Sequence, residues 1–171
     1  MSSAATIKIL RAMGELNMLG NKEHSMQTIC LFSGYGHPKS TPFAKGLRKL
    51  RLDGMINAGS TKGTLRLTEH GIRALPSDME PPRDTEQVHI RLRKFLSEKM
   101  ATNTDKLDQL WTILGNGKVH AVADLAKALG YGHVKSTSFV VLIRRLKELG
   151  VADSSKGKIQ LTDMAFPMGR P

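Results

Sequence analysis

An eight-residue segment that occurs twice limits what this 171-residue chain can fold into more than any other feature. GYGHPKST at 34–41 returns as GYGHVKST at 130–137, and only one position differs. The similarity continues downstream in identical pairs, namely Phe43 and Phe139, Arg48 and Arg144, Leu50 and Leu146, and Gly54 and Gly150. Self-similarity of this kind is the mark of a repeated structural unit. We therefore expect two copies of one module.

Each copy shows the same order of predicted elements. Helical spacing of apolar residues predicts three helices per copy. They lie at 5–16, 25–35 and 40–54 in the first copy, and at 104–117, 120–131 and 135–150 in the second. An apolar pair, a polar turn with Gly and Lys, and a strand at 64–68 or 158–162 then predict a β-hairpin. The expected fold class is mainly α with small β-hairpins (α+β).

A connecting segment separates the copies. Three prolines in PSDMEPPRD at 76–84 indicate an extended linker. Asp84 is a candidate N-cap for a helix at 85–100, which has no counterpart before the first copy and is interpreted as a spacer or as packing between the halves. The expected organisation is a first domain at residues 1–75, a proline-rich linker and connecting helix at 76–103, and a second domain at 104–171.

The repeated segment has features of a nucleotide-binding loop, because it combines glycines, a lysine and hydroxyls. That loop needs glycine directly before the lysine and a strand before the loop. Pro38 and Val134 stand before the lysine, and a helix precedes the segment. We therefore interpret the segment as the turn between the second and third helices, with Tyr35 and Tyr131 packed over the junction.

Three helices followed by a basic β-hairpin resemble the winged helix-turn-helix superfamily, and the hairpin corresponds to its wing. The resemblance covers nearly the whole chain apart from 76–103 and implies two tandem winged-helix domains joined by a linker helix. In helix-turn-helix folds the third helix enters the major groove of DNA. The resemblance thus implies a double-stranded DNA-binding protein, either a transcription regulator or a chromatin or architectural factor.

The charge distribution favours the same partner. The chain has 26 basic and 15 acidic residues, a net charge of +11 and a pI of about 10.0. Seven basic and two acidic residues lie at 34–71, and six basic and two acidic residues lie at 130–162, so these stretches carry +9 of the total. Such clustering of positive charge predicts contact with a polyanion, most often nucleic acid.

Helical geometry indicates which residues would contact DNA. If Phe43 is at the centre of the buried face, cations of the third helix lie on the opposite, outward face. These cations are expected to contact bases. Hydroxyls before the helix, with Thr41 as the expected N-cap, would cap it or donate to phosphates, and turn and wing lysines would contact phosphates. The candidate DNA-binding residues are Lys39, Ser40, Thr41, Lys45, Arg48, Lys49, Lys62 and Arg66 in the first module and Lys135, Ser136, Thr137, Arg144, Arg145, Lys156 and Lys158 in the second.

Two rival partner classes stay open. Exposed Val140 and Val141 on the second module's third helix would contact either a thymine methyl or a protein. Together with the 85–100 helix they support an alternative, a protein-interaction scaffold subunit that does not read DNA sequence. Structured RNA fits the charge, but aromatic residues are only 5% of the chain and stacking platforms are scarce.

Catalysis, metals and cofactors find no support in the sequence. The six histidines are scattered singly, and Cys30 is expected to be buried and inert in the second helix. His37 and His133 recur, either as turn histidines bonded to backbone or as phosphate contacts. Because no apolar run approaches the roughly 18 residues of a membrane span, no membrane partner is expected. The expected location is intracellular, with DNA in a nucleus or nucleoid.

Overall fold

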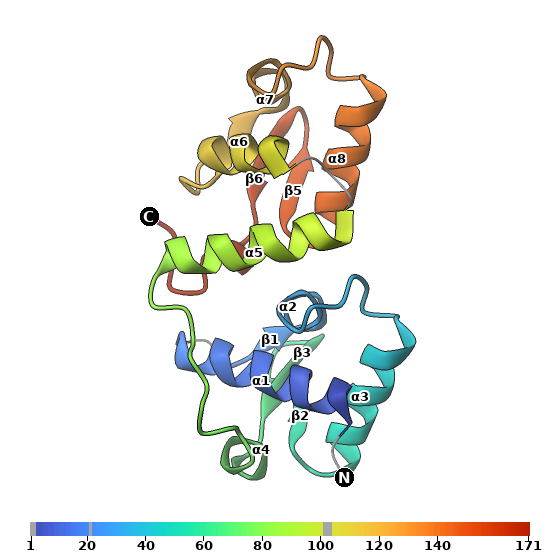
Figure 1. The fold of residues 1–171 in the computed structure, drawn as a ribbon, viewed down its shortest axis with the longest axis vertical. Helices are drawn as coiled ribbons and strands as arrows, with labels where there is room; N and C mark the ends of the chain where they lie inside the picture. Colours follow the sequence, from blue (N-terminus) through green and yellow to red (C-terminus); the bar gives the residue numbers. More distant parts are fainter. Residues whose placement is uncertain (1–2, 21, 101–103) are drawn as a thin grey trace. The chain divides into compact units, whose positions relative to one another are not determined.

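A computed structural model describes residues 3–20, 22–100 and 104–171. The chain divides into two compact units, Met1–Arg83 and Asp84–Pro171. Each unit combines helices with a three-stranded antiparallel sheet (Figure 1). The expected mixture of helices with small β elements is therefore confirmed, at the level of an α+β fold.

The first unit extends the predicted hairpin by a third strand. Its elements are α1 (Ala4–Met18), β1 (His24–Ser25), α2 (Met26–Phe32), α3 (Thr41–Leu52), β2 (Ile56–Ala58), β3 (Thr64–Leu67) and α4 (Glu69–Arg73). The sheet order is β1-β3-β2, with His24 opposite Leu65 and Ser25 opposite Thr64. The second helix is thus shorter than predicted, because Ser25 pairs in the sheet and caps α2 through its side chain.

The second unit repeats this order after one additional helix. Its elements are α5 (Thr85–Met100), α6 (Thr104–Leu114), β4 (His120–Ala121), α7 (Val122–Ala128), α8 (Thr137–Glu148), β5 (Ala152–Ser155), β6 (Lys158–Leu161) and the 3-10 helix η1 (Asp163–Ala165). The sheet order β4-β6-β5 matches the order β1-β3-β2. Both units therefore follow the sequence helix, strand, helix, helix, strand, strand.

Helix α3 forms because its apolar residues share one face. Phe43, Leu47 and Leu50 are at most 4% exposed and belong to one core cluster with Ile9 of α1. Burying each such side chain contributes about 1.5–3 kcal/mol. Gly46 lets α1 and α3 approach closely, because a Cβ there would lie 2.7 Å from Ile9 Cδ1. The buried face fixes which side chains of α3 point to solvent.

The start of α3 differs from the prediction by one residue. Ser40 has extended backbone angles and occupies the N-cap position, whereas Thr41 is the first helical residue. Pro42 is tolerated in this first turn because the first amides of a helix need no intrahelical acceptor. Ser136 and Thr137 hold the equivalent positions in α8, and neither serine makes a side-chain capping bond.

The proline-rich stretch packs back onto the first unit. A Cβ on Gly14 of α1 would lie 2.6 Å from Leu75 Cδ2 and 2.8 Å from Met79 Cε. Arg11 of the same helix forms an ion pair with Asp78 at 3.1 Å. The stretch at 76–83 therefore belongs to the first unit, whereas residues 101–103 at the end of the predicted connecting segment lie outside the described residues.

Helix α5 belongs to the second unit. The amide of Gln87 donates to Asp84 Oδ1 at 2.9 Å, which confirms Asp84 as its N-cap. Leu92 is fully buried, and α5 packs against α6 and η1. His89 Nε2 lies 2.9 Å from the Ala165 carbonyl oxygen, and its ring packs edge-on against Trp111 with centroids 5.5 Å apart. Helix α5 is thus a core helix of this unit.

His24 couples the stability of the first unit to pH. Its side chain is 4% exposed, and Nε2 lies 3.1 Å from Asn17 Oδ1. Burial lowers the pKa of His24 from 6.5 to about 4, although the neighbouring Glu23 carboxylate acts in the opposite direction. The folded unit therefore holds this imidazole neutral at pH values where the unfolded chain protonates it.

Acidification from pH 6.5 to about 4 is expected to remove roughly 3 kcal/mol of the first unit's unfolding free energy through His24 alone. The unfolded state gains this proton near pH 6.5, so the loss begins there and is complete below the folded pKa. Urea unfolding of the wild type and of His24→Gln across this range measures it. Parallel pH profiles for the two proteins would contradict the assignment.

Candidate nucleic-acid interface

The turn before α3 has the same geometry as the turn before α8. Gly34 and Gly130 adopt φ of 84° and 81°, which is the left-handed region that glycine occupies without strain. Tyr35 packs on Phe43 with ring centroids 5.7 Å apart, and the equivalent pair in the second unit is 5.3 Å apart. The expectation that the tyrosines cover the helix junction is confirmed.

The recurrent histidines brace this turn. His37 Nδ1 accepts a hydrogen bond from the Lys39 amide at 3.0 Å, and His133 Nδ1 accepts one from the Lys135 amide at 3.0 Å. Both histidines are exposed. Because Nδ1 is the acceptor, a neutral ring carries its proton on Nε2 and has one donor left for an outside group.

The outward face of α3 carries two cations without partners. Lys45 and Arg48 are exposed, and in the described part of the chain neither side chain makes a hydrogen bond or ion pair. Lys49 is different, because its Nζ lies 3.1 Å from Asp53 Oδ1. The sequence correctly placed all three on the surface, but only Lys45 and Arg48 are available without breaking an existing interaction.

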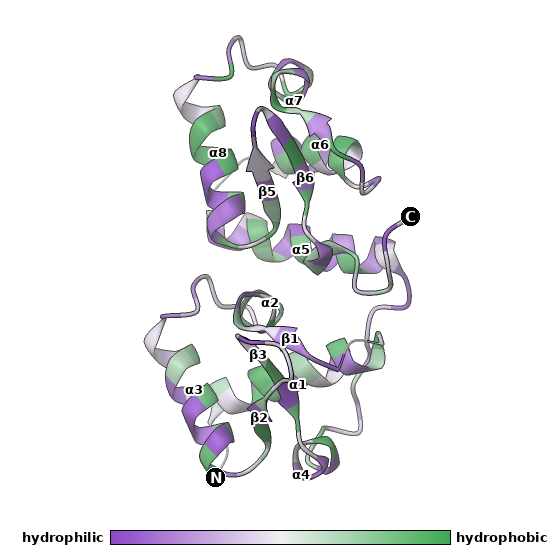
Figure 2. Ribbon diagram, turned by 180° about the vertical axis from the view of Figure 1, so that it is seen from behind, coloured by the Kyte–Doolittle hydropathy of each residue, from purple (hydrophilic) through white to green (hydrophobic). Residues whose placement is uncertain are grey.

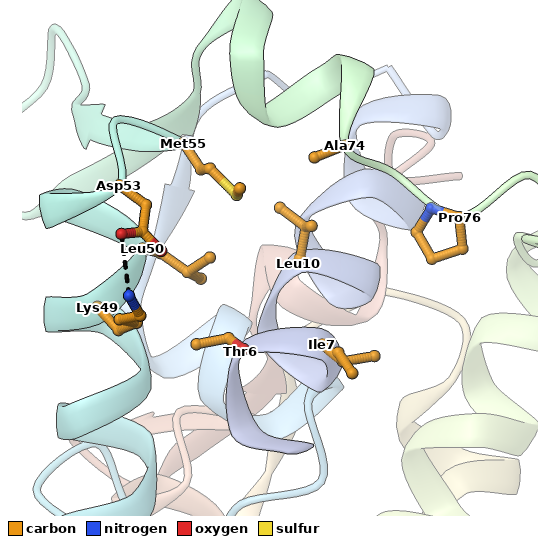
Figure 3. Close-up of a pocket in the computed structure, with 9 residues that line it drawn as sticks. All are labelled: Thr6, Ile7, Leu10, Lys49, Leu50, Asp53, Met55, Ala74 and Pro76. Carbon is orange, nitrogen blue, oxygen red and sulfur yellow. Dashed lines mark hydrogen bonds and ion pairs between the residues drawn. The ribbon is translucent and has the colours of Figure 1, made fainter. Parts of the chain in front are cut away.

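Lys49 and Asp53 lie beside a small pocket between α1 and α3 (Figure 3). Leu10 of α1 and Leu50 of α3 contribute to its apolar wall, and Met55 follows α3. The pocket measures about 110 Å³. Ligand pockets usually measure roughly 300–1,000 Å³, so this one is smaller than a typical substrate site.

The four candidate hydroxyls divide by exposure. Thr41 and Thr137 are exposed at the first helical position of α3 and α8. Ser40 and Ser136 are half-buried, and Ser40 Oγ is enclosed without a hydrogen-bond partner among the described residues. A phosphate can therefore reach the threonine of the first unit but not the enclosed Ser40 hydroxyl.

The β2–β3 hairpin is anchored by an acidic residue that the sequence did not reveal. Glu23 accepts hydrogen bonds from the Ser60 amide at 2.7 Å and from Ser60 Oγ at 2.8 Å. These bonds lower the pKa of Glu23. At the turn, Lys62 is exposed and has no side-chain partner in the described residues, whereas Arg66 Nε donates to Asn57 Oδ1 at 3.2 Å. The hairpin turn that carries Lys62 is thus held in place by the bonds between Ser60 and Glu23.

In α8, the helix of the second unit that corresponds to α3, the arginines already have partners within the protein. Arg144 and Arg145 both pair with Glu148, at 3.9 Å and 3.3 Å. Arg145 also donates to the Lys99 carbonyl oxygen of α5 at 3.3 Å. Val141 occupies the position that Lys45 has in α3. Helix α8 therefore lacks the partner-free pair of outward cations found on α3.

Three candidate lysines of the second unit lie outside α8. Lys135 in the turn, and Lys156 and Lys158 in the β5–β6 hairpin, are exposed and make no side-chain ion pair within the described ranges. Two further exposed cations were missed by the sequence analysis, Arg51 on α3 and its counterpart Lys147 on α8. Each follows an arginine by three residues. Because residues three apart are neighbours on a helix surface, this spacing could have predicted them.

The described residues contain neither a metal cluster nor a membrane-spanning helix. Among residues 3–20, 22–100 and 104–171, no three His, Cys, Asp or Glu side chains come together as a metal site. Cys30 is buried, as expected, and no helix in these ranges is both long and apolar enough to cross a membrane. Comparison of the chain with known protein families, with curated proteins and with solved structures finds no match.

Proposed function

We propose that the protein binds double-stranded DNA and that the first unit is the principal reader. In this proposal each unit is a winged-helix domain, α3 enters the major groove, and the β2–β3 hairpin is the wing beside it. The observation that carries the proposal is the surface formed by the turn, α3 and the hairpin. Lys39, Lys45, Arg48 and Lys62 are exposed there, and no acidic side chain neutralises them within the described residues.

The chemistry of these side chains fits the two kinds of DNA contact. Arg48 can donate two parallel hydrogen bonds to a guanine edge, and Lys45 can reach a base or a phosphate. Lys39, Thr41 and the Nε2–H of His37 lie at the start of α3, where a phosphate would meet several donors. Base contacts from α3 would determine sequence specificity. Phosphate contacts from the turn and the wing would orient the protein on the DNA and contribute salt-dependent affinity.

The second unit takes a secondary role in DNA binding. Its arginines on α8 are engaged by Glu148, so its contribution comes from Lys135, Lys156 and Lys158 against phosphates. Contacts of this type raise affinity without specifying sequence. The protein then acts as a transcription regulator or as a chromatin or architectural factor, inside the cell where the DNA is.

Titration of the full chain with duplex DNA, single-stranded DNA and an RNA hairpin tests the proposal. We expect preference for the duplex and a linear fall of log K with log salt, with a slope of about −0.9 for each phosphate neutralised. Selection of bound duplexes from a random pool then separates a specific regulator, which enriches a motif, from an architectural protein. Absence of duplex binding at low salt, or equal affinity for the three ligands, would refute it.

The rival function, a protein-interaction scaffold, is favoured by one observation. Val140 and Val141 on α8 are 45% and 39% exposed, although the chain buries most of its other large apolar side chains. If the protein is a scaffold that does not bind DNA, none of the three nucleic acids in the titration would bind. The two functions also coexist if each unit has its own ligand.

A further inference from the structure

A groove of about 540 Å³ runs along α8. Its apolar lining comes from Val122 of α7, Val134 of the turn, and Phe139, Val140 and Ile143 of α8. Figure 2 shows the corresponding apolar band at the start of α8. The volume lies within the range of sites that hold ligand groups. It has room for a few apolar side chains of a partner.

The charges at the edge of the groove are unbalanced. Arg144, Lys147 and Glu148 line it. Glu148 is already paired with Arg144 and with Arg145, so its negative charge is offset. Lys147 makes no hydrogen bond or ion pair among the described residues, and exposed Lys135 directly follows Val134 of the lining. The charges left without a partner beside this apolar surface are positive.

We propose that this groove docks an amphipathic segment of another protein, with apolar side chains in the groove and Asp or Glu side chains against Lys147 and Lys135. An amphipathic helix laid into an apolar groove is a recurrent mode of recognition. The inference extends beyond DNA binding, because it concerns the second unit and a different ligand.

Charge and lining favour this occupant over two others. A second copy of this chain carries a net charge of +11, so its approach to a cationic rim is unfavourable. Duplex DNA offers thymine methyl groups but no apolar side chains to fill a groove. Val140 and Val141 stand where α3 has Ala44 and Lys45, so the change from the first unit exchanges a cation for apolar surface.

A peptide selection on the immobilised full chain tests the proposal. Random peptides of about 16 residues, roughly four helical turns, are displayed on phage and enriched. We expect enriched sequences with apolar residues three and four positions apart and with Asp or Glu between them. Fluorescence anisotropy of labelled peptides should then show at least ~10-fold weaker binding to Val140→Asp. The matched control is Val119→Asp, because Val119 is 53% exposed and lies outside the groove lining. This control should bind the peptides as tightly as the wild type does.

Charge variants provide the second readout. Lys147→Ala should weaken the enriched peptides by about 3-fold, and Glu148→Gln should strengthen them by about 2-fold, because the rim becomes less or more positive. Peptides without acidic residues, equal binding to the Val140 and Val119 variants, or no enrichment at all would overturn the proposal. Self-association lost in Val140→Asp would assign the groove to a second copy instead.

The duplex affinity of the Val140→Asp variant distinguishes the docking proposal from the proposed DNA-binding function. Val140→Asp should retain duplex affinity within about 3-fold, because the principal reader is in the first unit. A drop of ~10-fold or more would assign the groove to nucleic acid and overturn the docking proposal. Conversely, a wild-type chain that binds the peptides but no duplex contradicts only the proposed DNA-binding function.

Discussion

Replacing Lys45 and Arg48 together by alanine is expected to weaken duplex DNA binding by roughly 10- to 1,000-fold. Both side chains lie on the outward face of α3, and neither has an intramolecular partner in the described residues. Their removal is therefore expected to delete contacts with DNA and no hydrogen bond or ion pair among the described residues. Thermal unfolding of the variant should match that of the wild type, because substitutions at such surface positions usually change stability by no more than about 0.5 kcal/mol.

Two matched double variants separate recognition from net charge. Arg73→Ala with Lys94→Ala removes the same charge from exposed positions on α4 and α5, and should change affinity by less than about 3-fold. Arg144→Ala with Arg145→Ala should cost less than the α3 variant, because Glu148 already engages both arginines. Equal losses from all three variants would contradict a reader helix in the first unit.

Salt and sequence dependence assign the individual roles of the two α3 cations. If Arg48 contacts a base, Arg48→Ala should relax preference at one position of the selected site, with a cost of about 1–3 kcal/mol. If Lys45 contacts a phosphate, Lys45→Ala should weaken all sequences alike and reduce the salt slope by about 1. Gel-shift titrations on selected and scrambled duplexes at several salt concentrations measure both effects.

The elements that were predicted correctly are those with a local signal. The apolar stripe of α3, from Phe43 to Leu50, repeats at helical spacing and needs no knowledge of the rest of the chain. Gly54 and Gly150 directly follow the C-cap residues of α3 and α8, and their φ of 71° and 76° is the left-handed conformation common at helix ends. The internal repeat then extended each assignment from one unit to the other.

The features that escaped prediction depend on partners far along the chain. Strands β1 and β4 are two residues long, too short for any alternation, and exist only because β3 and β6 lie beside them. Glu23 contacts Ser60 across 37 positions, and His89 contacts Ala165 across 76. Nothing in the local pattern marks these pairs, so the third strand, the hairpin anchor and the placement of α5 required the folded structure.

The candidate site shows the same division. Exposure of Lys45, Arg48 and Lys49 follows from helical geometry, and the structure agrees. Which cations are engaged depends on side-chain placement, because Lys49 pairs with Asp53 just after α3, whereas Lys45 has no such partner in the described residues. The bond between Arg145 and the Lys99 carbonyl joins two helices and could not be read from either one.

Leu92→Ala is expected to reduce the unfolding free energy of the second unit by about 2–5 kcal/mol. The side chain is fully buried on α5, so its truncation loses apolar burial and leaves a cavity. Trp111 is the single tryptophan of the chain, is 4% exposed and contacts His89 of α5. Its fluorescence during urea unfolding therefore reports on the unit that contains the substitution.

Ile90→Ala on the same helix is the matched control. Its side chain is 51% exposed, and the substitution should shift stability by no more than about 0.5 kcal/mol. A helix that only spaced two modules would tolerate both substitutions equally, and equal unfolding curves would contradict a core role for α5. If α5 is a core helix of the second unit and α3 reads DNA independently, Leu92→Ala should also retain the Lys45- and Arg48-dependent binding at temperatures where the second unit is destabilised.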